Sequence, residues 1–243
     1  MTNRIVLNNV DHGDLTVRPR FGAAFGDQVN SVRLFPTEYD AASREYAILF
    51  RQDTESAQTF AVALLGLDAN ENLFLEGACW NARYIPAVQS RGPFSIGLQR
   101  NDDGSPSEAL IHVDLDDPRV DRGAEKGHPV FLAQGGNSPF LDSVVTVLRT
   151  ISEGLEVEPA MIAAFTEFEL IQPVKLEIQI DDRSRYDLVD FLTIDGDRLA
   201  ALDGPALEKL HRAGFLRLAF AAASSLGNIS QLIELKNRAR ATA

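Results

Sequence analysis

An alternating stretch near residue 180 restricts the fold of this chain more than any other feature of the sequence. Apolar residues occupy every second position there, namely Val174, Leu176, Ile178 and Ile180. The residues between them are polar, and successive side chains of a strand point to opposite faces. The pattern therefore predicts a strand with one buried and one solvated face, as in an antiparallel sheet. Asp182–Ser184 is expected to turn the chain into a second strand over Tyr186–Ile194, which completes a hairpin.

Shorter strands are predicted in the first half of the chain. Short apolar runs bounded by polar residues are typical of buried strands. They occur at Glu45–Arg51, Thr59–Leu67, Leu73–Leu75, Phe94–Gln99 and Ala109–Leu115. Asp68–Asn72 and Asn101–Pro106 are rich in turn-forming residues, so each is expected to join two strands. The charged stretch Asp116–Gly127 is expected to be an exposed loop, because Pro118 ends the strand before it.

Helical periodicity begins after residue 138. Ser138 and Pro139 suit the first turn of a helix, since serine caps free amides and proline has no N–H to lose. Apolar residues recur at helical spacing up to Gly154, where this helix is expected to stop, and Pro159 is expected to start the next one. Two further helices are expected, from Pro205 to Gly214 and from Phe215 to about Arg238.

These elements predict an α+β fold. Its core would be an antiparallel β-sheet, drawn mainly from the N-terminal two-thirds of the chain and covered by helices from the C-terminal half. The 243 residues, of which 45% are hydrophobic and 24% charged, suit a globular domain near the upper limit of size. No tandem repeat or long linker divides them, so a single domain over residues 1–243 is expected.

Charge and cysteine content exclude several classes of partner and site. Thirty-five acidic residues against 23 basic ones give a net charge of −12. Binding to nucleic acid or to anionic membranes requires clustered Lys and Arg, which are scattered here, so these are poor partners, and basic or neutral partners remain open. A single cysteine excludes a disulfide within the chain and zinc sites built from several cysteines. No apolar run approaches a membrane helix of roughly 20 residues, and the first residues carry no secretory signal pattern, so we expect a cytoplasmic protein.

One group of residues suggests the chemistry of an enzyme. His112, Asp114 and Asp116 would share one face of a strand, with side chains about 7 Å apart. An imidazole with two carboxylates could hold a divalent metal or supply a base. The ordinary alternation of an amphipathic strand predicts the same pattern, and we favour that interpretation.

Three other candidates have simpler structural explanations. His12, between Asp11 and Asp14, could be oriented for catalysis by a carboxylate, but we interpret it as a turn residue. Cys79 has no histidine near it in the sequence, so we interpret it as an inert, buried or half-buried thiol. Residues 135–138 precede a helix start, which can receive an anion, although the need for a flexible loop explains these glycines as well. No nucleophilic-serine or phosphate-binding glycine pattern occurs.

The segment from Asn70 to Phe94 is the most unusual in the chain. It combines aromatic residues with arginines, and prolines stiffen its backbone. The candidate binding residues in it are Trp80, Arg83, Tyr84, Arg91 and Phe94. Aromatic rings and fixed cations give a large contact area at low entropic cost, so they can form a surface for a ligand or a peptide. Alternatively, the segment is an irregular part of the core, in which Trp80 fills space and the arginines bind carbonyls.

Four groups of motifs resemble the SapC family of bacteria and span nearly the whole chain. They are Asn8-x-Val10-x-His12-x-x-Leu15; Asn72-Leu73-Phe74-Leu75-Glu76 with Trp80, Tyr84-Ile85-Pro86 and Pro93-Phe94; Asp114-Leu115-Asp116-x-Pro118-Arg119; and Thr193-Ile194-Asp195 through Leu199, with Leu210-His211-x-Ala213-Gly214-Phe215 and Ser225-Leu226. The resemblance implies an association with surface-layer protein export. It also implies genes near TonB-dependent outer-membrane receptors and flavin-dependent, tryptophan-halogenase-like proteins. It supplies no catalytic residues, and His12 falls on a family motif whereas His112 lies at a variable position.

These observations favour a non-catalytic accessory or binding protein in bacterial surface-layer export or TonB-linked envelope uptake. The aromatic segment and His12 would provide its contact residues. We expect no cofactor or metal, and the partner would be a protein or small molecule of an envelope or halogenase-type pathway. Two alternatives stay open. One is an enzyme, with or without a metal, that uses His12 or the face of His112, Asp114 and Asp116. The other is a structural protein that self-associates, for example as a homodimer, through the helix from Phe215, although we favour the interpretation that this helix covers the sheet of its own subunit.

Overall fold

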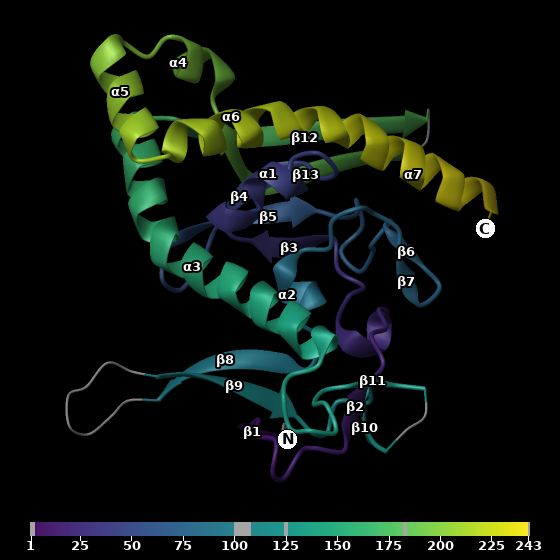
Figure 1. Cartoon of the computed structure of the whole chain (residues 1–243). Coiled ribbons are helices and arrows are strands. Elements are labelled where there is room, and N and C mark those ends of the chain that lie inside the picture. The colour runs from purple at the N-terminus through teal and green to yellow at the C-terminus, as the bar shows by residue number, and fades with distance from the viewer. Residues whose placement is uncertain (1–2, 100–107, 124–125, 182–183, 243) are drawn as a thin grey trace. The chain divides into compact units, whose positions relative to one another are not determined.

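The computed structural model describes residues 3–99, 108–123, 126–181 and 184–242 (Figure 1). The chain divides into two compact units. Unit 1 comprises Met1–Arg20 and Ala87–Ser152, and unit 2 comprises Phe21–Pro86 and Glu153–Ala243. Both units combine antiparallel strands with helical segments, so the predicted α+β class is confirmed. The single domain over residues 1–243 stays a prediction.

Unit 1 contains two small sheets. The first has the order β1-β9-β8, with β1 at Arg4–Val6, β9 at Glu108–Asp114 and β8 at Phe94–Gln99. The second has the order β10-β2-β11, with β10 at Val120–Arg122, β2 at Leu15–Val17 and β11 at His128–Pro129. The short helix α2 (Ala87–Ser90) and the first part of α3 (Pro139–Glu167) complete the unit. The core of unit 1 joins residues of the strands to the inner face of α3: Leu15, Val17, Phe94, Val113, Val130, Phe131, Leu141, Val144 and Leu148.

The predictions for unit 1 are partly confirmed. β8 and β9 pair as expected, with Ile96 opposite Ile111, while the turn predicted at Asn101–Pro106 lies outside the described residues. The exposed loop predicted over Asp116–Gly127 is wrong in part, because β10 lies within it and pairs with β2. Val120 is the reason, since this isolated apolar residue packs against the core of unit 1 although its neighbours are charged.

Unit 2 is built on a five-stranded antiparallel sheet of order β12-β13-β4-β5-β3. Its strands are β3 (Ser31–Leu34), β4 (Ile48–Gln52), β5 (Thr59–Leu64), β12 (Ile171–Asp181) and β13 (Ser184–Ile194). A small hairpin is formed by β6 (Leu75–Glu76) and β7 (Cys79–Trp80). The helical segments, besides the second part of α3, are η1 (Ala23–Phe25), η2 (Pro36–Glu38), α1 (Tyr39–Ala42), α4 (Gly196–Ala200), α5 (Gly204–Arg212), α6 (Phe215–Ser225), η3 (Leu226–Asn228) and α7 (Ile229–Thr242).

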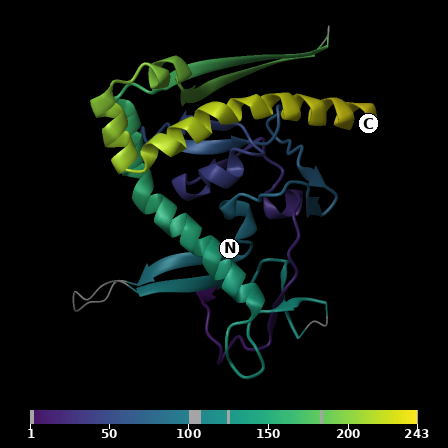
Figure 2. The same cartoon turned by 45° about the horizontal axis from the view of Figure 1, so that its top comes forward.

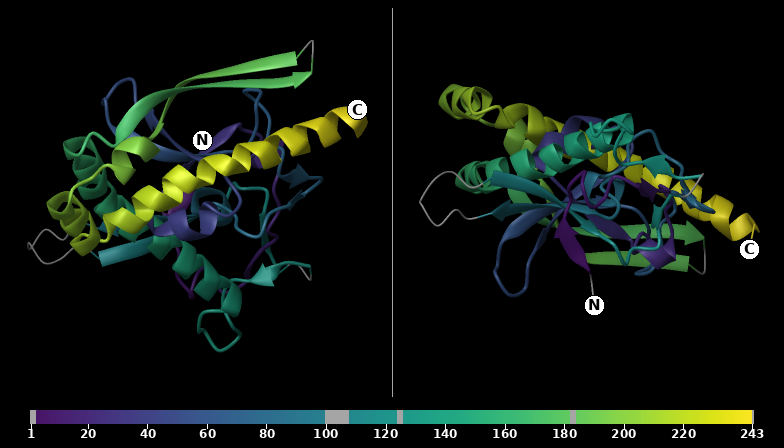
Figure 3. Two further views of the ribbon diagram at one scale, coloured as in Figure 1. Left: turned by 90° about the horizontal axis from the view of Figure 1, so that it is seen from above. Right: turned by 60° about the horizontal axis from the view of Figure 1, so that its bottom comes forward.

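The hairpin of β12 and β13 confirms the alternation seen in the sequence. Its two strands of 11 residues pair antiparallel, with Ile178 opposite Tyr186, and Figures 2 and 3 show the hairpin running alongside α7. Leu218, Ala219 and Ala222 of α6 are buried within unit 2. These residues of the apolar stripe therefore cover their own unit, and self-association through the helix from Phe215 stays a prediction. Among the described residues, no helix has the length and apolar character needed to cross a membrane.

Two helix predictions are wrong in their boundaries. α3 continues without a break through Gly154 and Pro159. A Cβ added at Gly154 would lie 2.4 Å from Cβ of Phe35, so glycine here permits a close approach and does not end the helix. The helix predicted from Phe215 to about Arg238 is divided by η3. Nδ2 of Asn228 donates to two backbone carbonyls of the segment before β4, which holds the chain out of the regular helix at this point.

Candidate functional site

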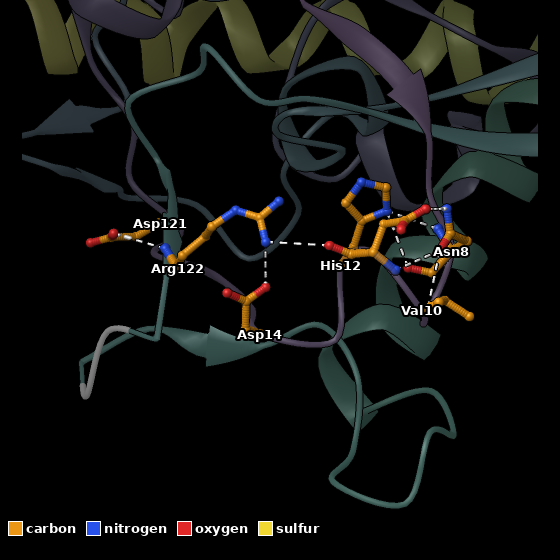
Figure 4. A network of polar contacts seen from close by, with 7 residues as sticks. Asn8, Val10, His12, Asp14, Asp121 and Arg122 are labelled. Atoms are coloured by element: carbon orange, nitrogen blue, oxygen red, sulfur yellow. Dashed lines mark hydrogen bonds and ion pairs between the residues drawn. The ribbon is translucent and has the colours of Figure 1, made fainter.

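The loop that contains His12 is closed by its own hydrogen bonds (Figure 4). Oδ1 of Asn8 accepts from the backbone N–H groups of Val10 at 3.0 Å and Asp11 at 2.8 Å. His12 is buried, and its Nδ1 accepts from the backbone N–H of Asn8 at 3.1 Å. Nδ1 also lies 3.1 Å from the backbone carbonyl oxygen of Asn8, so the imidazole bonds to Asn8 in either neutral tautomer. Asn8 and His12 thus close one turn from both ends, which accounts for their joint presence in one sequence motif.

The two carboxylates beside His12 do not contact its imidazole. Asp11 accepts from Nδ2 of Asn8 at 3.0 Å, and Asp14 pairs with Nη1 of Arg122 at 2.6 Å. Figure 4 shows Arg122 and Asp14 on one side of His12 and Asn8 on the other. Neither carboxylate is therefore placed to orient His12 as a base, and the arrangement agrees with our interpretation of His12 as a turn residue.

The start of α3, where an anion site was considered, is occupied by groups of the chain itself. Oγ of Ser138 accepts from the backbone N–H of Leu141 at 3.1 Å, as a capping serine does. Nδ2 of Asn137 donates to Asp142 in the first turn at 3.3 Å. Gly135 accepts from Nδ2 of Asn9 at 2.9 Å, so these glycines support contacts between loops within unit 1.

His112, Asp114 and Asp116 do not converge. His112 lies on β9 with its ring against Gly97, where an added Cβ would be 2.5 Å from Cε1 of the histidine. Asp116 lies beyond the end of β9, and Oδ1 of Asp114 accepts from its backbone N–H at 3.1 Å. Among the described residues, no three His, Cys, Asp or Glu side chains are grouped so that they could hold a metal ion.

A buried chain of hydrogen bonds connects the aromatic residues of unit 2. Nε1 of Trp80 donates to Oη of Tyr46 at 2.8 Å, and Tyr46 donates to the backbone carbonyl of Tyr84. Oη of Tyr84 donates to Oε1 of Glu38 at 2.7 Å, and Oε2 of Glu38 accepts from the backbone N–H of Phe35 at 2.9 Å. Burial, together with the charge of Glu38, raises the pKa of Tyr84 far above its usual value. The side chains of Trp80 and Tyr84 therefore link segments of unit 2 through these internal hydrogen bonds.

The other predicted binding residues differ sharply in exposure. Phe94 is fully buried in the core of unit 1, and Nη1 of Arg91 donates to its backbone carbonyl at 2.9 Å. Burial lowers the pKa of Arg91, and the charges of Arg4 and Arg119 lower it further. The side chain of Arg83 is 96% exposed, with Nε 3.8 Å from Glu45. His12, Arg91 and Phe94 belong to unit 1 and the other three to unit 2, so the six do not form one cluster within either unit.

An open cleft lies beside the small hairpin of unit 2, and sequence reasoning missed it. This hairpin cleft has a volume of about 550 Å³. Its lining residues are Gly22, Ala23, Gln28, Asp68, Asn70, Glu71, Asn72, Leu73, Leu75, Gly77 and Ala239. They come from three separate segments, residues 22–28, 68–77 and 239, although Asn72, Leu73 and Leu75 belong to one motif of the sequence. The motif could have indicated a site at these residues, but the sequence does not show which distant residues lie next to them.

The walls of the hairpin cleft are tied together by buried polar contacts. Asp27 accepts from the backbone N–H of Gly22 at 2.8 Å, and Nδ2 of Asn72 donates to the backbone carbonyl of Asp27 at 2.8 Å. Trp80 packs edge-on against Phe21 with ring centroids 5.6 Å apart. Trp80, which donates a hydrogen bond to Tyr46, therefore also links the hairpin to the segment that leads into the Gly22–Asp27 loop.

Lys236 of α7 secures the acidic side of the hairpin cleft. Its Nζ lies 2.6 Å from Asp68 and 2.5 Å from Glu71, and its side chain is almost fully buried. Burial alone would lower the pKa of Lys236, but the two carboxylates outweigh that effect and raise it. Lys236 offsets one of these two negative charges, and the cleft is lined by both polar and apolar residues.

Cys79 is exposed on β7, so the expectation of a buried or half-buried thiol is wrong. The reason is strand alternation, because Trp80 beside it points inward and is buried. The thiol consequently lies on the outside of the hairpin that carries Gly77, a lining residue of the cleft.

The comparisons with known proteins give one match. No curated protein and no solved structure matches the chain. The family model described as SapC matches residues 7–232, which takes in the His12 loop, α6 and every lining residue of the hairpin cleft except Ala239. A match over this range includes nearly all of both units, and we conclude that the chain belongs to the SapC family.

Proposed function

We propose that this protein is a non-catalytic, cytoplasmic accessory protein of a bacterial surface-layer export or TonB-linked envelope uptake system, and that it binds its partner in the hairpin cleft. Membership of the SapC family supports the cellular context. The observation that carries the binding role is the cleft itself, whose walls are held by the chain of Trp80, Tyr46, Tyr84 and Glu38.

The chemistry of the polar groups supports binding over catalysis. Catalysis by a base or a nucleophile requires side chains within hydrogen-bond reach of each other and of a reacting atom. In the His12 loop and around Trp80, the described polar groups instead bond to backbone atoms and to one another. Such groups fix the shape of a surface, and a preformed surface with polar and apolar parts suits the recognition of a partner.

Cys79 provides the experiment, because it is the single cysteine and lies exposed on the hairpin beside the cleft. A photoreactive benzophenone is attached to its thiol, and the labelled protein is irradiated in an extract of the native host. Variant Ala23→Trp then fills the cleft, whereas Ala201→Trp adds the same ring at an exposed alanine outside it. The adduct should decrease at least severalfold in Ala23→Trp and stay unchanged in Ala201→Trp. Equal adduct in both variants, with both folded by circular dichroism, would reject the cleft as the binding surface.

A further inference from the structure

The five-stranded sheet of unit 2 is interrupted between β4 and β13. β4 pairs with β5 along its whole length, from Ile48 opposite Ala63 to Gln52 opposite Thr59. With β13 it forms a single register pair, Leu192 opposite Phe50, and none of its other described residues pairs with that strand. A cleft of about 590 Å³ opens beside this pair. Its lining residues are Gln52, Thr54, Pro173, Val174, Lys175, Val189, Asp190, Phe191 and Leu192.

A β-bulge shapes the wall of this sheet cleft. Val174 pairs with Phe191 and Leu176 pairs with Leu188, so Lys175 lies opposite two residues, Val189 and Asp190. Asp190 has φ of 65°, in the left-handed region. A bulge disrupts the strand ladder and redirects the side chains at that point, and such features recur next to binding sites. Here it places Val189 and Asp190 together at the rim of the cleft.

The carboxylate of Asp190 lacks a partner among the described residues. Its neighbours on the hairpin are paired: Arg185 lies 2.9 Å from Asp187 and 2.8 Å from Glu177. Lys175, which also lines the cleft, is engaged by Glu177 at 2.6 Å. The rim therefore presents one negative charge that no cation of the described chain neutralises. A cationic group of a ligand would pair with this carboxylate.

The rest of the sheet cleft is apolar. Its floor contains Phe191, which is buried beneath the guanidinium of Arg51 at 4.8 Å from the ring centroid. Val189, beside Asp190, is 53% exposed although it is aliphatic. Val174 adds a further apolar wall. An aliphatic stem that ends in a cation, as in lysine or arginine, matches an apolar surface next to a free carboxylate.

We propose that the sheet cleft binds an extended segment of a partner protein that presents a lysine or arginine to Asp190. The interrupted pairing of β4 with β13 supports an extended occupant, because an unpaired strand edge can bond to the backbone of a peptide. The net charge of −12 favours the approach of a basic segment. This site is separate from the hairpin cleft and does not depend on it.

The test uses random heptapeptides displayed on phage and selected on the full chain. Selected peptides should contain lysine or arginine, and replacement of that residue by norleucine, which keeps the stem without the charge, should weaken binding about fivefold in titration calorimetry. Asp190→Asn should weaken binding about fivefold. Asp190→Gly should weaken binding by a similar factor. Asparagine and glycine both tolerate the positive φ of this position, so neither variant strains the backbone. Asp187→Asn, which alters a paired carboxylate on the same strand, should bind like the wild type.

Several results would overturn the proposal. A selection that yields no peptide, or only peptides without a basic residue, removes the proposed ligand class. Retained affinity in Asp190→Asn or Asp190→Gly removes the charge contact. Equal affinity for 1,5-diaminopentane and for the selected peptides means that the cation alone is recognised, and the extended segment is then wrong.

Discussion

Nε1 of Trp80 donates a hydrogen bond to Oη of Tyr46 at 2.8 Å, and the same hydroxyl donates to the backbone carbonyl of Tyr84. One buried hydroxyl thus joins the small hairpin, the segment after it and the chain that leads into β4. Both contacts are lost together if the hydroxyl is removed, while the ring of Tyr46 still packs against Phe74, with centroids 4.8 Å apart.

Tyr46→Phe is expected to lower the free energy of unfolding by about 2–3 kcal/mol. The substitution leaves the Trp80 N–H and the Tyr84 carbonyl without their partner, and each buried unpaired group costs about 1–3 kcal/mol, less what relaxation recovers. Urea denaturation measures the change. Tyr186→Phe is the control, because its hydroxyl makes no hydrogen bond to any described residue, and its change should stay within about 0.5 kcal/mol. A similar loss in both variants would contradict the prediction.

Tyr39→Phe is expected to leave stability unchanged or to raise it by up to about 1 kcal/mol. Tyr39 is fully buried, and its hydroxyl has no partner among the described residues. Burial, together with the charges of Glu158 and Glu38, raises the pKa of Tyr39, so the hydroxyl stays neutral. Removing an unpaired buried hydroxyl recovers its desolvation cost. A loss above about 1 kcal/mol in the same urea assay would mean that the hydroxyl is hydrogen-bonded in solution.

Gly154→Ala is expected to destabilise the protein by about 1–3 kcal/mol, although alanine is the better helix former by about 1 kcal/mol. The new Cβ would lie 2.4 Å from Cβ of Phe35, which cannot move without its backbone. Gly227→Ala is the matched control, since a Cβ there meets no atom within 4 Å. Thermal unfolding should show a lower midpoint for Gly154→Ala alone, and a raised midpoint would show that α3 does not approach Phe35 this closely.

Lys236→Met is expected to lower the free energy of unfolding by about 2 kcal/mol at neutral pH, because it leaves Asp68 and Glu71 without their cation. Lys209→Met, which breaks an exposed pair with Glu167, should cost at most about 1 kcal/mol.

The pKa of Lys236 is raised in the folded state. Its contribution is therefore complete below the unfolded pKa of about 10.4 and is lost as the pH rises through the folded value. The difference between wild type and Lys236→Met should shrink only above about pH 10, and a difference that shrinks already at neutral pH would contradict it.

Asp117→Asn is expected to remove an acid-sensitive part of the stability of unit 1. Burial alone would raise the pKa of Asp117, but hydrogen bonds from Arg119, at 2.7 Å from Nη2 and 2.9 Å from Nε, outweigh it and lower the pKa. The contribution is thus present above the unfolded pKa of about 3.9 and is lost as the pH falls through the folded value.

Denaturation curves of Asp117→Asn at several pH values measure this effect. The variant should be less stable than the wild type by about 1–2 kcal/mol at pH 7, and the two should converge below about pH 4. Asp121→Asn is the control, because its contact with Arg18 is long and exposed, at 3.5 Å. A gap for Asp117→Asn that stays constant down to pH 2 would contradict the assignment.

The sequence predicted those parts of the site that depend on local pattern. Asn8 and His12 close a turn of five residues, and the side chain of Asn8 bonds backbone groups just after it, which agrees with the interpretation of His12 as a turn residue. The sequence also identified the segment of Trp80 as unusual, and its core interpretation agrees with the burial of that side chain. The sequence did not indicate that Tyr46 is the hydrogen-bond partner of Trp80, because a hydrogen bond between distant segments leaves no periodic pattern.

The sequence by itself determined the fold class and the long hairpin of β12 and β13, since alternation and turn residues act between neighbours in the chain. Only the tertiary structure decided that Gly154 continues a helix, that Cys79 faces outward, and that Asp190 stands at a gap in the sheet. Each of these depends on a contact or a strand register formed with a remote segment. The structural role of Gly154 or Asp190 therefore depends on which remote residues the fold places next to it.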